Sequence, residues 1–345
     1  MDPELATTSE APIGPASIPR IGFRARPGWQ QAVIGVGAVA GAFLLYELPK
    51  TGLSPYWINL ACLVLIYSIG TLGFNVAVGW SGQLALAHAG FYGLGAYTTA
   101  VLWKDHGWPF FLAMAAAGAL AGVVGVLISW PAMPLRGFYL AIATLALGQL
   151  FVQLFVQFDS ITGGGSGKQV PRFRVPGTGR TEGLYYMCLG TAVVCFFLVW
   201  RLVGTRLGRT LKSVRDIEIA AQSVGVQPVK YRLIAFGVAS GLAAIAGGLQ
   251  SQYSTFVFPL QFGTALLVQF LTMMILGGVG SMTGSVIGAA FAVFVLEFFR
   301  KAKPEWESWQ PMAFGGVLML CVAALPGGLV SLPTRLRGLR RRTVT

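Results

Sequence analysis

Long uncharged stretches alternate with short polar segments along most of this chain. No residue between 51 and 103, or between 233 and 296, carries a formal charge. Stretches of about 18 or more mostly apolar residues are typical of membrane-spanning helices. These stretches are continuous rather than alternating, which favours helices over a membrane barrel. The pattern therefore predicts an all-α, polytopic membrane helical bundle.

The breaks between apolar stretches predict how many helices cross the membrane. The two longest stretches must each hold more than one helix, with breaks expected near 79–82, 258–259 and 277–280. Together the stretches fit about ten spans, with eight or nine, or a re-entrant segment replacing one span, left open. The expected spans lie within residues 31–48, 51–103, 109–130, 137–158, 183–202, 233–296 and 311–325.

Composition and charge support a membrane protein and argue against nucleic-acid binding. Only 11% of the residues are charged and the mean hydropathy is +0.68, whereas a soluble domain has about 25% charged residues. The formal net charge is +13, but the basic residues gather in the N-terminal arm, in residues 206–232 and in the tail. Such positions flank spans on the cytoplasmic side. We therefore expect no nucleic-acid partner and both termini in the cytoplasm.

The same reasoning divides the chain into parts. Residues 1–28 predict a disordered cytoplasmic arm, because they lack the apolar core of a signal peptide. Residues 29–330 predict the transmembrane domain, and residues 331–345 a basic cytoplasmic tail. The Gly- and Pro-rich residues 160–182 predict a loop on the opposite side of the membrane.

One polar island, residues 206–232, separates two apolar stretches. A hydrated, helix-forming segment between spans is a docking surface, so we expect a coupling loop at 206–230 that contains a helix at 214–225. Acidic Asp216 and Glu218 would lie in the N-terminal half of that helix, where the helix dipole favours them. The alternative is an ordinary amphipathic helix at the membrane surface.

Small residues shape the expected helix of the island. Ala220 and Ala221 would leave a shallow face that can sit in a groove of a partner. Gly225 would end the helix, and Pro228 would prevent its continuation.

The sequence contains no constellation for catalysis or metal binding. The glycine-rich residues 162–169 do not form a phosphate-binding loop. Such a loop needs Gly at the position of Thr162 and Ser or Thr at the position of Gln169, so this segment is not a nucleotide site. The four cysteines lie in apolar stretches, where they act as small hydrophobic residues. Glu297 is an acid inside an apolar stretch, and we favour a pair with Arg300 over a proton relay. We expect no enzymatic activity, metal or cofactor in this chain; if the protein is powered by ATP, the subunit that hydrolyses it is separate.

Polar side chains on apolar spans are candidates for a solute path. An unsatisfied polar group is costly in hydrocarbon, so these side chains should face the interior of the bundle or its water-filled path. We expect His88 to pack inside the bundle or to line the path rather than to bind a metal, since no acidic residue lies three or four positions away in the sequence. The candidate residues are Ser81, Gln83, His88, Thr144 and Gln149.

Several separated segments resemble the permease subunits of branched-chain amino acid (Liv-type) ABC importers, in particular the LivM-like member of the pair. They occur in family order at residues 75–97, 137–148, 162–167, 206–232 and 276–289. In the island, Ala220, Ala221 and Gly225 match the importer pattern Glu-Ala-Ala-x-x-x-Gly, with Ile219 where Glu is usual.

The resemblance implies partners and a solute. The partners would be a second homologous permease subunit, two ATP-binding subunits and an extracytoplasmic solute-binding protein, in a bacterial inner membrane. The solute would be a branched-chain or other hydrophobic amino acid, with urea, short amides and aromatic acids as alternatives. An ion-coupled secondary transporter is the alternative class, and it would need charged groups at mid-membrane. The residues expected to couple to the ATPase are Arg215, Asp216, Glu218, Ala220, Ala221 and Gly225.

Overall fold

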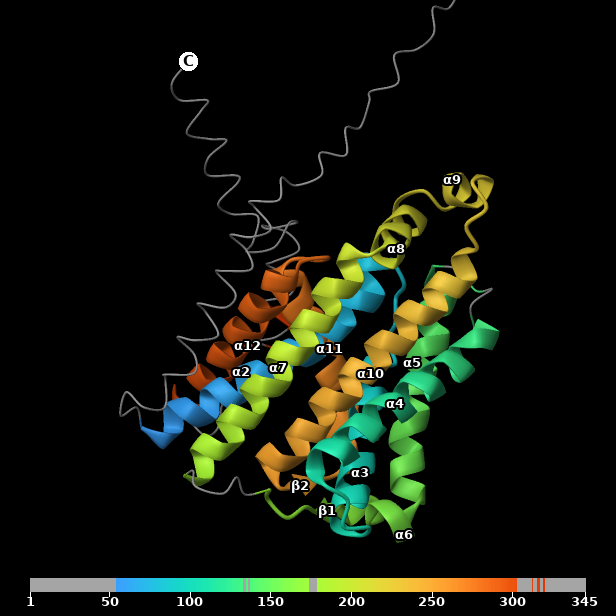
Figure 1. Cartoon of the computed structure of the whole chain (residues 1–345). Helices are drawn as coiled ribbons and strands as arrows, with labels where there is room; N and C mark the ends of the chain where they lie inside the picture. Colours follow the sequence, from blue (N-terminus) through green and yellow to red (C-terminus); the bar gives the residue numbers. More distant parts are fainter. Residues whose placement is uncertain are drawn as a thin grey trace, which may run out of the picture. The chain divides into compact units, whose positions relative to one another are not determined.

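The computed structural model describes residues 54–302, apart from 133, 134, 136 and 174–178, together with the isolated positions 312, 315, 316 and 319 (Figure 1). The expected spans at 31–48 and 311–325, the arm and the tail lie outside the described residues.

The described chain is almost entirely helical. The helices are α2 (Pro55–Asn75), α3 (His88–Lys104), α4 (Phe110–Ser129), α5 (Phe138–Gln157), α6 (Asp159–Thr162), α7 (Arg180–Gly204), α8 (Arg206–Asp216), α9 (Glu218–Ser223), α10 (Pro228–Ser254), α11 (Thr264–Gly277) and α12 (Met282–Ala302). A π-helical turn (Val76–Trp80) extends α2, and 3-10 turns lie at Trp130–Ala132, Gly164–Ser166 and Pro259–Phe262. Two short strands, β1 (Lys168–Gln169) and β2 (Phe256–Val257), pair antiparallel, with Lys168 opposite Val257.

The expected class of fold is confirmed at the coarse level. Within the described residues, six helices are long and apolar enough to cross a membrane. The chain breaks after the π-helical turn, before Pro259 and between α11 and α12, as expected from the glycine and proline positions. The expected total of about ten spans stays a prediction, because two of those spans lie outside the described residues.

Helices α2 and α10 form the centre of the bundle. Two thirds of the apolar window of each is buried (67%), compared with 33% for α4 and α7, which leaves one side of those two helices exposed. Glycines allow the central helices to approach closely. A Cβ atom added at Gly247 of α10 would lie 1.9 Å from the Tyr92 carbonyl of α3, and one at Gly122 of α4 would lie 3.3 Å from the Gly237 carbonyl of α10. Small residues where two helix backbones meet are typical of helices that pack closely in lipid.

The polar segments lie at two opposite ends of the bundle. Figure 1 shows α8 and α9 at one end and α6, β1 and β2 at the other; we call these the island end and the loop end. The described part of the expected loop at 160–182 contains part of α6, a 3-10 turn and β1, and α7 already begins at Arg180. Glu182 accepts a hydrogen bond from the Gly179 N–H at 3.3 Å, which caps α7.

Candidate functional site

The polar island forms two helices rather than the single helix expected at 214–225. Helix α8 ends at Asp216, Ile217 is extended (φ −145°, ψ 89°), and α9 begins at Glu218. The expectation for Asp216 was therefore wrong. It lies at the C-terminal end of α8, where the helix dipole disfavours an acid, and it pairs there with the neighbouring Arg215. Glu218 does lie at a helix N-terminus, and its carboxylate pairs with Arg232 at 2.9 Å.

The end of α9 is a glycine-terminated helix of the expected kind. Gly225 adopts the left-handed conformation (φ 83°). The Val226 N–H bonds the Ala221 carbonyl at 3.1 Å and the Gly225 N–H bonds the Gln222 carbonyl at 2.9 Å. Together these bonds form a Schellman motif. Pro228 has a role beyond blocking continuation, since it occupies the first turn of α10, a position that proline favours.

The exposed face of α9 differs from the one expected. Ala220 is exposed, but Ala221 is only 4% exposed and points into the protein. The outward face instead carries two large β-branched side chains, Ile219 (81% exposed) and Val224 (77% exposed), and Ile217 is also exposed. Exposed apolar side chains that cluster on a polar segment indicate a protein contact.

Arg215 connects the island to the bundle. Its guanidinium Nη1 donates a hydrogen bond of 2.5 Å to the carbonyl of Gly79 in the π-helical turn. A Cβ atom added at Gly82 would lie 2.7 Å from Arg215 Cγ, and one at Gly280 would lie 3.5 Å from Arg215 Nη1. The structure thus brings together three segments that are far apart in the sequence: 79–82, the island and the turn between α11 and α12.

Asn75 joins the same three-way junction from the end of α2. Its Nδ2 donates to the Ser281 carbonyl (3.2 Å) and to Ser285 Oγ (3.1 Å), while its Oδ1 accepts from the Gly280 N–H (2.7 Å). The side chain is completely buried. The sequence analysis did not single out Asn75, although it begins one of the segments that carry the family resemblance.

Four of the five polar residues predicted on spans are buried. Ser81, Gln83, His88 and Thr144 are 1 to 3% exposed, whereas Gln149 is exposed and donates from Nε2 to Thr264 Oγ1 at 2.6 Å. Gln149 is therefore not buried in the bundle, and its place on the solute path stays a prediction. Because the cavity described below borders none of these five residues, their assignment to a path stays a prediction.

The buried residues among them hold irregular backbone in place. Gln83 Nε2 donates to Ser81 Oγ (2.7 Å) and to the Arg232 carbonyl (3.0 Å). Thr144 Oγ1 accepts from the Leu86 N–H at 3.1 Å. His88 lies 2.8 Å from the Gly70 carbonyl through Nε2 and packs against Phe74 and Phe270. These contacts fix residues 81–87, the non-helical connection between α2 and α3, against α5 and α10.

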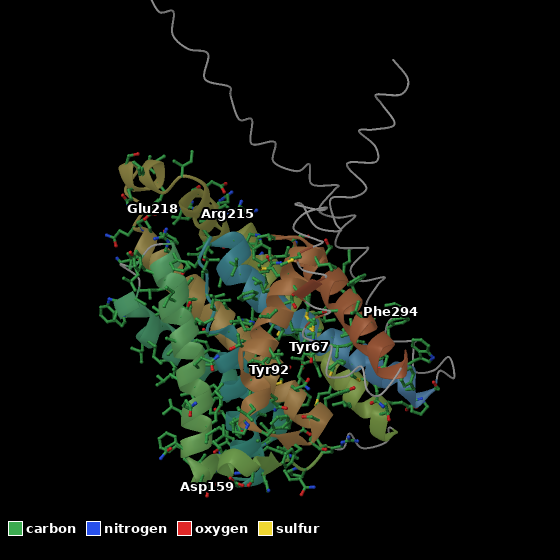
Figure 2. All side chains as sticks on the ribbon, turned by 180° about the vertical axis from the view of Figure 1, so that it is seen from behind. Tyr67, Tyr92, Asp159, Arg215, Glu218 and Phe294 are labelled. Atoms are coloured by element: carbon green, nitrogen blue, oxygen red, sulfur yellow. The ribbon has the colours of Figure 1, made fainter. Side chains whose placement is uncertain are left out.

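A cavity of about 410 Å³ lies among α2, α3, α10, α11, α12 and the 3-10 turn before α11. We call it the deeper cavity. Its polar lining consists of Tyr67, Tyr92, Gln250, Gln261, Thr264 and Gln269. Figure 2 shows Tyr67 and Tyr92 in the middle of the bundle. No charged side chain borders the cavity among the described residues.

Two glutamines of this cavity have spare hydrogen-bonding capacity. The amide nitrogens of Gln261 and Gln269 are buried and make no hydrogen bond of normal length among the described residues, although the Gln269 amide lies beside the Tyr67 hydroxyl. Gln250 Oε1 accepts a bond from Tyr92 at 3.3 Å. A buried donor without an acceptor costs about 1–3 kcal/mol. A polar solute in the cavity could supply the missing acceptors. The sequence analysis overlooked these glutamines, although a glutamine in an uncharged stretch is the signal that pointed to Gln83.

The described residues contain no group of three or more potential metal-ligating side chains. Cys62, Cys188 and Cys195 are free and buried. Glu297 accepts a hydrogen bond from the Tyr56 hydroxyl; the side chain of Arg300, its expected partner, lies outside the described residues.

Comparisons with known proteins show which proteins this chain resembles. Residues 56–323 match the family model described as "Branched-chain amino acid transport system / permease component". The chain is 33% identical to the "High-affinity branched-chain amino acid transport system permease protein LivM" of Escherichia coli (strain K12), with 79% of this chain and 69% of that protein covered. It is 27% identical to the "Probable branched-chain amino acid transport permease protein LivM" of Methanocaldococcus jannaschii, with 64% and 67% covered.

A relative with a different printed role is also similar. The chain is 25% identical to the "Autoinducer 2 import system permease protein LsrC" of Escherichia coli O157:H7, with 85% of this chain and 87% of that protein covered. Among solved structures, "PsaBC from Streptococcus pneumoniae in complex with Fab" has a TM-score of 0.44 at 14% identity, covering 82% of this chain and 94% of that chain.

Proposed function

Because the chain belongs to the family of branched-chain amino acid transport system permease components, we propose that its solute is a branched-chain or other hydrophobic amino acid. The chain is a permease subunit of an ABC importer, and an ion-coupled secondary transporter is not favoured. The family match across residues 56–323 carries this conclusion. The specific solute is our proposal, since the relatives include permeases for branched-chain amino acids and for autoinducer 2.

The uncharged cavity supports an amino acid as the solute. Its tyrosine rings can contact an apolar side chain, and its three glutamines offer amide donors and acceptors to the polar end. Urea, short amides and aromatic acids are the alternatives that the test below distinguishes.

We propose that α9 is the element that a separate ATP-binding subunit grips. Ile219, Ala220 and Val224 give it an exposed, mostly apolar face outside the bundle. Arg215, at the end of the preceding helix, connects the island to the π-helical turn through Gly79. Movement of α9 would therefore reach the end of α2 and the turn between α11 and α12.

The proposed topology places the island end in the cytoplasm and the loop end outside. The island holds six cationic side chains between 206 and 232, a concentration that favours the cytoplasmic side. The complete importer would contain this chain, a second homologous permease, two ATP-binding subunits and an extracytoplasmic binding protein in a bacterial inner membrane. This chain would contribute no enzymatic activity, and ATP and magnesium would bind to the partner subunits.

The solute is tested with the importer reconstituted in proteoliposomes. Leucine, isoleucine and valine loaded on the binding protein should each drive ATP-dependent uptake and stimulate ATP hydrolysis. Uptake of urea, a short amide or an aromatic acid in place of the aliphatic amino acids would contradict the proposed solute.

Coupling is tested by placing a charge on the exposed face of α9. Ala220→Glu should abolish uptake and the stimulation of ATP hydrolysis by the loaded binding protein, with the protein still folded and inserted, because the side chain is exposed. Ser213→Glu adds the same charge to an exposed site on α8 and serves as the matched control. Ala221→Glu is unsuitable, since its charge would be buried. Full uptake by the Ala220→Glu variant would show that α9 is not the coupling element.

A further inference from the structure

A second cavity, of about 340 Å³, opens at the loop end of the bundle. It lies among the beginning of α2, the residues just after β1, the end of α10 and the C-terminal part of α12. We call it the vestibule; its residues include Tyr56, Asn59, Arg172, Tyr253, Leu296 and Glu297. In contrast to the deeper cavity, it combines one cationic and one anionic side chain, Arg172 and Glu297.

The two charged groups are supported differently. Glu297 is half-buried on α12, where the Tyr56 hydroxyl donates a hydrogen bond to it. Arg172 is exposed, on the segment that follows β1. That segment is tied to neighbouring elements, because the Pro171 carbonyl accepts a bond from Trp103 (3.1 Å) and the Phe173 N–H donates to Gln252 (2.7 Å). The backbone on both sides of Arg172 is therefore held in place.

Leu296 connects the vestibule to the deeper cavity. It is the residue that borders both spaces among the described residues, and it precedes Glu297 on α12. A solute that moves from the vestibule to the glutamine-lined cavity would pass this apolar side chain.

We propose that the vestibule is a receiving site for the zwitterionic end of an α-amino acid, with Arg172 binding the carboxylate, Glu297 binding the ammonium group and Leu296 forming the constriction to the deeper cavity. This inference rests on the proposed function, and it adds a site and an order of events. Arginine is suited to carboxylates because its planar fork donates two parallel hydrogen bonds. A carboxylate has several acceptor positions, so Glu297 would bind the ammonium group alongside the contacts that it already makes, the bond from Tyr56 among them.

The difference between the two cavities gives the solute a direction. A site that conducts must bind its solute strongly enough to receive it and weakly enough to release it. In the vestibule, the charged side chains of Arg172 and Glu297 replace part of the water that hydrates the two charged groups of the zwitterion, and the rest of that water stays. The deeper cavity has no charged side chain among the described residues. A single charge there would attract one end of the zwitterion and repel the other. Its glutamine amides can instead donate to the carboxylate and accept from the ammonium group.

The first test uses the complete importer with its binding protein in proteoliposomes. Arg172→Gln and Glu297→Gln should each lower leucine uptake roughly ten- to hundredfold, which is the contribution of a hydrogen bond to a charged group. Arg172 lies in an exposed segment, so its variant tests the site even if the Glu297 variant is poorly folded. Lys104→Gln and Asp159→Asn change the charge at the same end without bordering the vestibule. Their uptake should stay within about twofold of the unchanged protein.

The second test separates solute binding from docking of the binding protein. Saturation-transfer NMR is recorded on the permease–ATPase complex in nanodiscs, without the binding protein, with leucine as the probe. The unchanged complex should show leucine signals that the Arg172→Gln and Glu297→Gln variants lose. Leucinamide, which lacks the carboxylate, and 4-methylpentanoate, which lacks the ammonium group, should compete weakly.

A bulky residue at the constriction tests the order of the two sites. Leu296→Trp should abolish uptake while the leucine signal of the vestibule persists. Loss of that signal together with uptake would contradict the order.

The outcomes distinguish this inference from the proposed function. If the importer takes up leucine but both charge variants keep the leucine signal, the inference is overturned and the proposed function stands. The same holds if Arg172→Gln only raises the KM for the loaded binding protein, since Arg172 would then serve docking. If the unchanged importer takes up no aliphatic amino acid, the proposed function fails, and the inference fails with it.

Discussion

At the island end of the bundle, Asn75 uses both halves of its amide to bond the turn between α11 and α12, and Arg215 bonds the end of α2. In the deeper cavity, by contrast, Gln261 and Gln269 keep amide nitrogens that have no partner among the described residues. Both regions bury amide side chains in an apolar surrounding, but the Asn75 amide is bonded through both its nitrogen and its oxygen, whereas Gln261 and Gln269 have unbonded amide nitrogens.

This difference separates two roles that a buried polar side chain can have in a membrane bundle. A fully bonded amide stabilises one arrangement of helices, because in hydrocarbon a broken bond finds no water to replace it. An amide whose N–H groups have no partner can instead donate a hydrogen bond to a solute that enters the cavity. The junction around Asn75 therefore suits the transmission of movement, and the glutamine-lined cavity suits a passing solute.

The largest effect is expected from breaking the junction. Asn75→Leu would leave the Gly280 N–H without its acceptor, whereas the Ser285 hydroxyl would keep its bond to the Ser281 carbonyl. At about 1–3 kcal/mol for an unsatisfied buried group, the free energy of unfolding should fall by roughly that amount, and uptake should be lost. Thermal unfolding in detergent and leucine uptake measure the two effects. Asn59→Leu, in the half-buried lining of the vestibule, is the control for stability, and a similar Tm for the two variants would contradict the prediction.

A smaller effect is expected at the link between the island and the bundle. Arg215→Met removes the bond to the Gly79 carbonyl, but the side chain is 37% exposed, so the loss of stability should be only about 1 kcal/mol. Uptake for each ATP hydrolysed should fall, since α8 would no longer hold the π-helical turn. Arg209→Met, at an exposed position of the same helix, should leave this ratio unchanged. An unchanged ratio in Arg215→Met would show that the link does not transmit movement.

In the deeper cavity, function and stability should respond in opposite directions. Gln261→Leu and Gln269→Leu each remove an unpaired buried donor, so the free energy of unfolding should stay constant or rise by up to about 1 kcal/mol. Leucine uptake should nevertheless fall severalfold. Gln153→Leu, at an exposed position on α5, is the control. If the cavity variants lose stability as Asn75→Leu does, their amides serve structure rather than solute.

The smallest effects are expected from the two acids of the island. Glu218 and Arg232 form a pair whose side chains are 22% and 17% exposed, so Glu218→Ala should cost about 1 kcal/mol. Asp216 is 59% exposed and pairs with an adjacent residue, so Asp216→Ala should change stability by less than about 0.5 kcal/mol. Denaturant titration of the two purified variants measures the difference, and equal losses would show that the partial burial of the Glu218 pair adds nothing.

The sequence predicted those features that depend on local backbone chemistry. Glycine and proline mark the breaks at 79–82, 258–259 and 277–280, and Gly225 ends α9 in the left-handed conformation that glycine adopts readily. The continuous apolar stretches likewise determined the class of fold.

Features that depend on partners distant in the sequence could not be predicted. Nothing in Asp216-Ile217-Glu218 is a strong helix breaker, yet the island helix is divided there. Arg215 bonds Gly79, 136 positions away, and Glu218 pairs with Arg232, 14 positions away, so each side of the break is held by a different part of the bundle. The cavity escaped prediction for the same reason, because its glutamines come from three separate elements.

The π-helical turn Val76–Trp80 holds one more residue in each hydrogen-bonded ring than the α-helix before it. This surplus residue can be passed along the helix by exchanging i→i+5 bonds for i→i+4 bonds one at a time, so the number of bonds hardly changes. Each residue that the surplus passes turns by roughly 100° about the helix axis, while the residues beyond keep their register. Helix α2 therefore contains a stored increment of rotation, located where Gly79 meets Arg215. Deleting Val78 would remove this increment, and slower hydrogen exchange at amides 76–80 would report its loss.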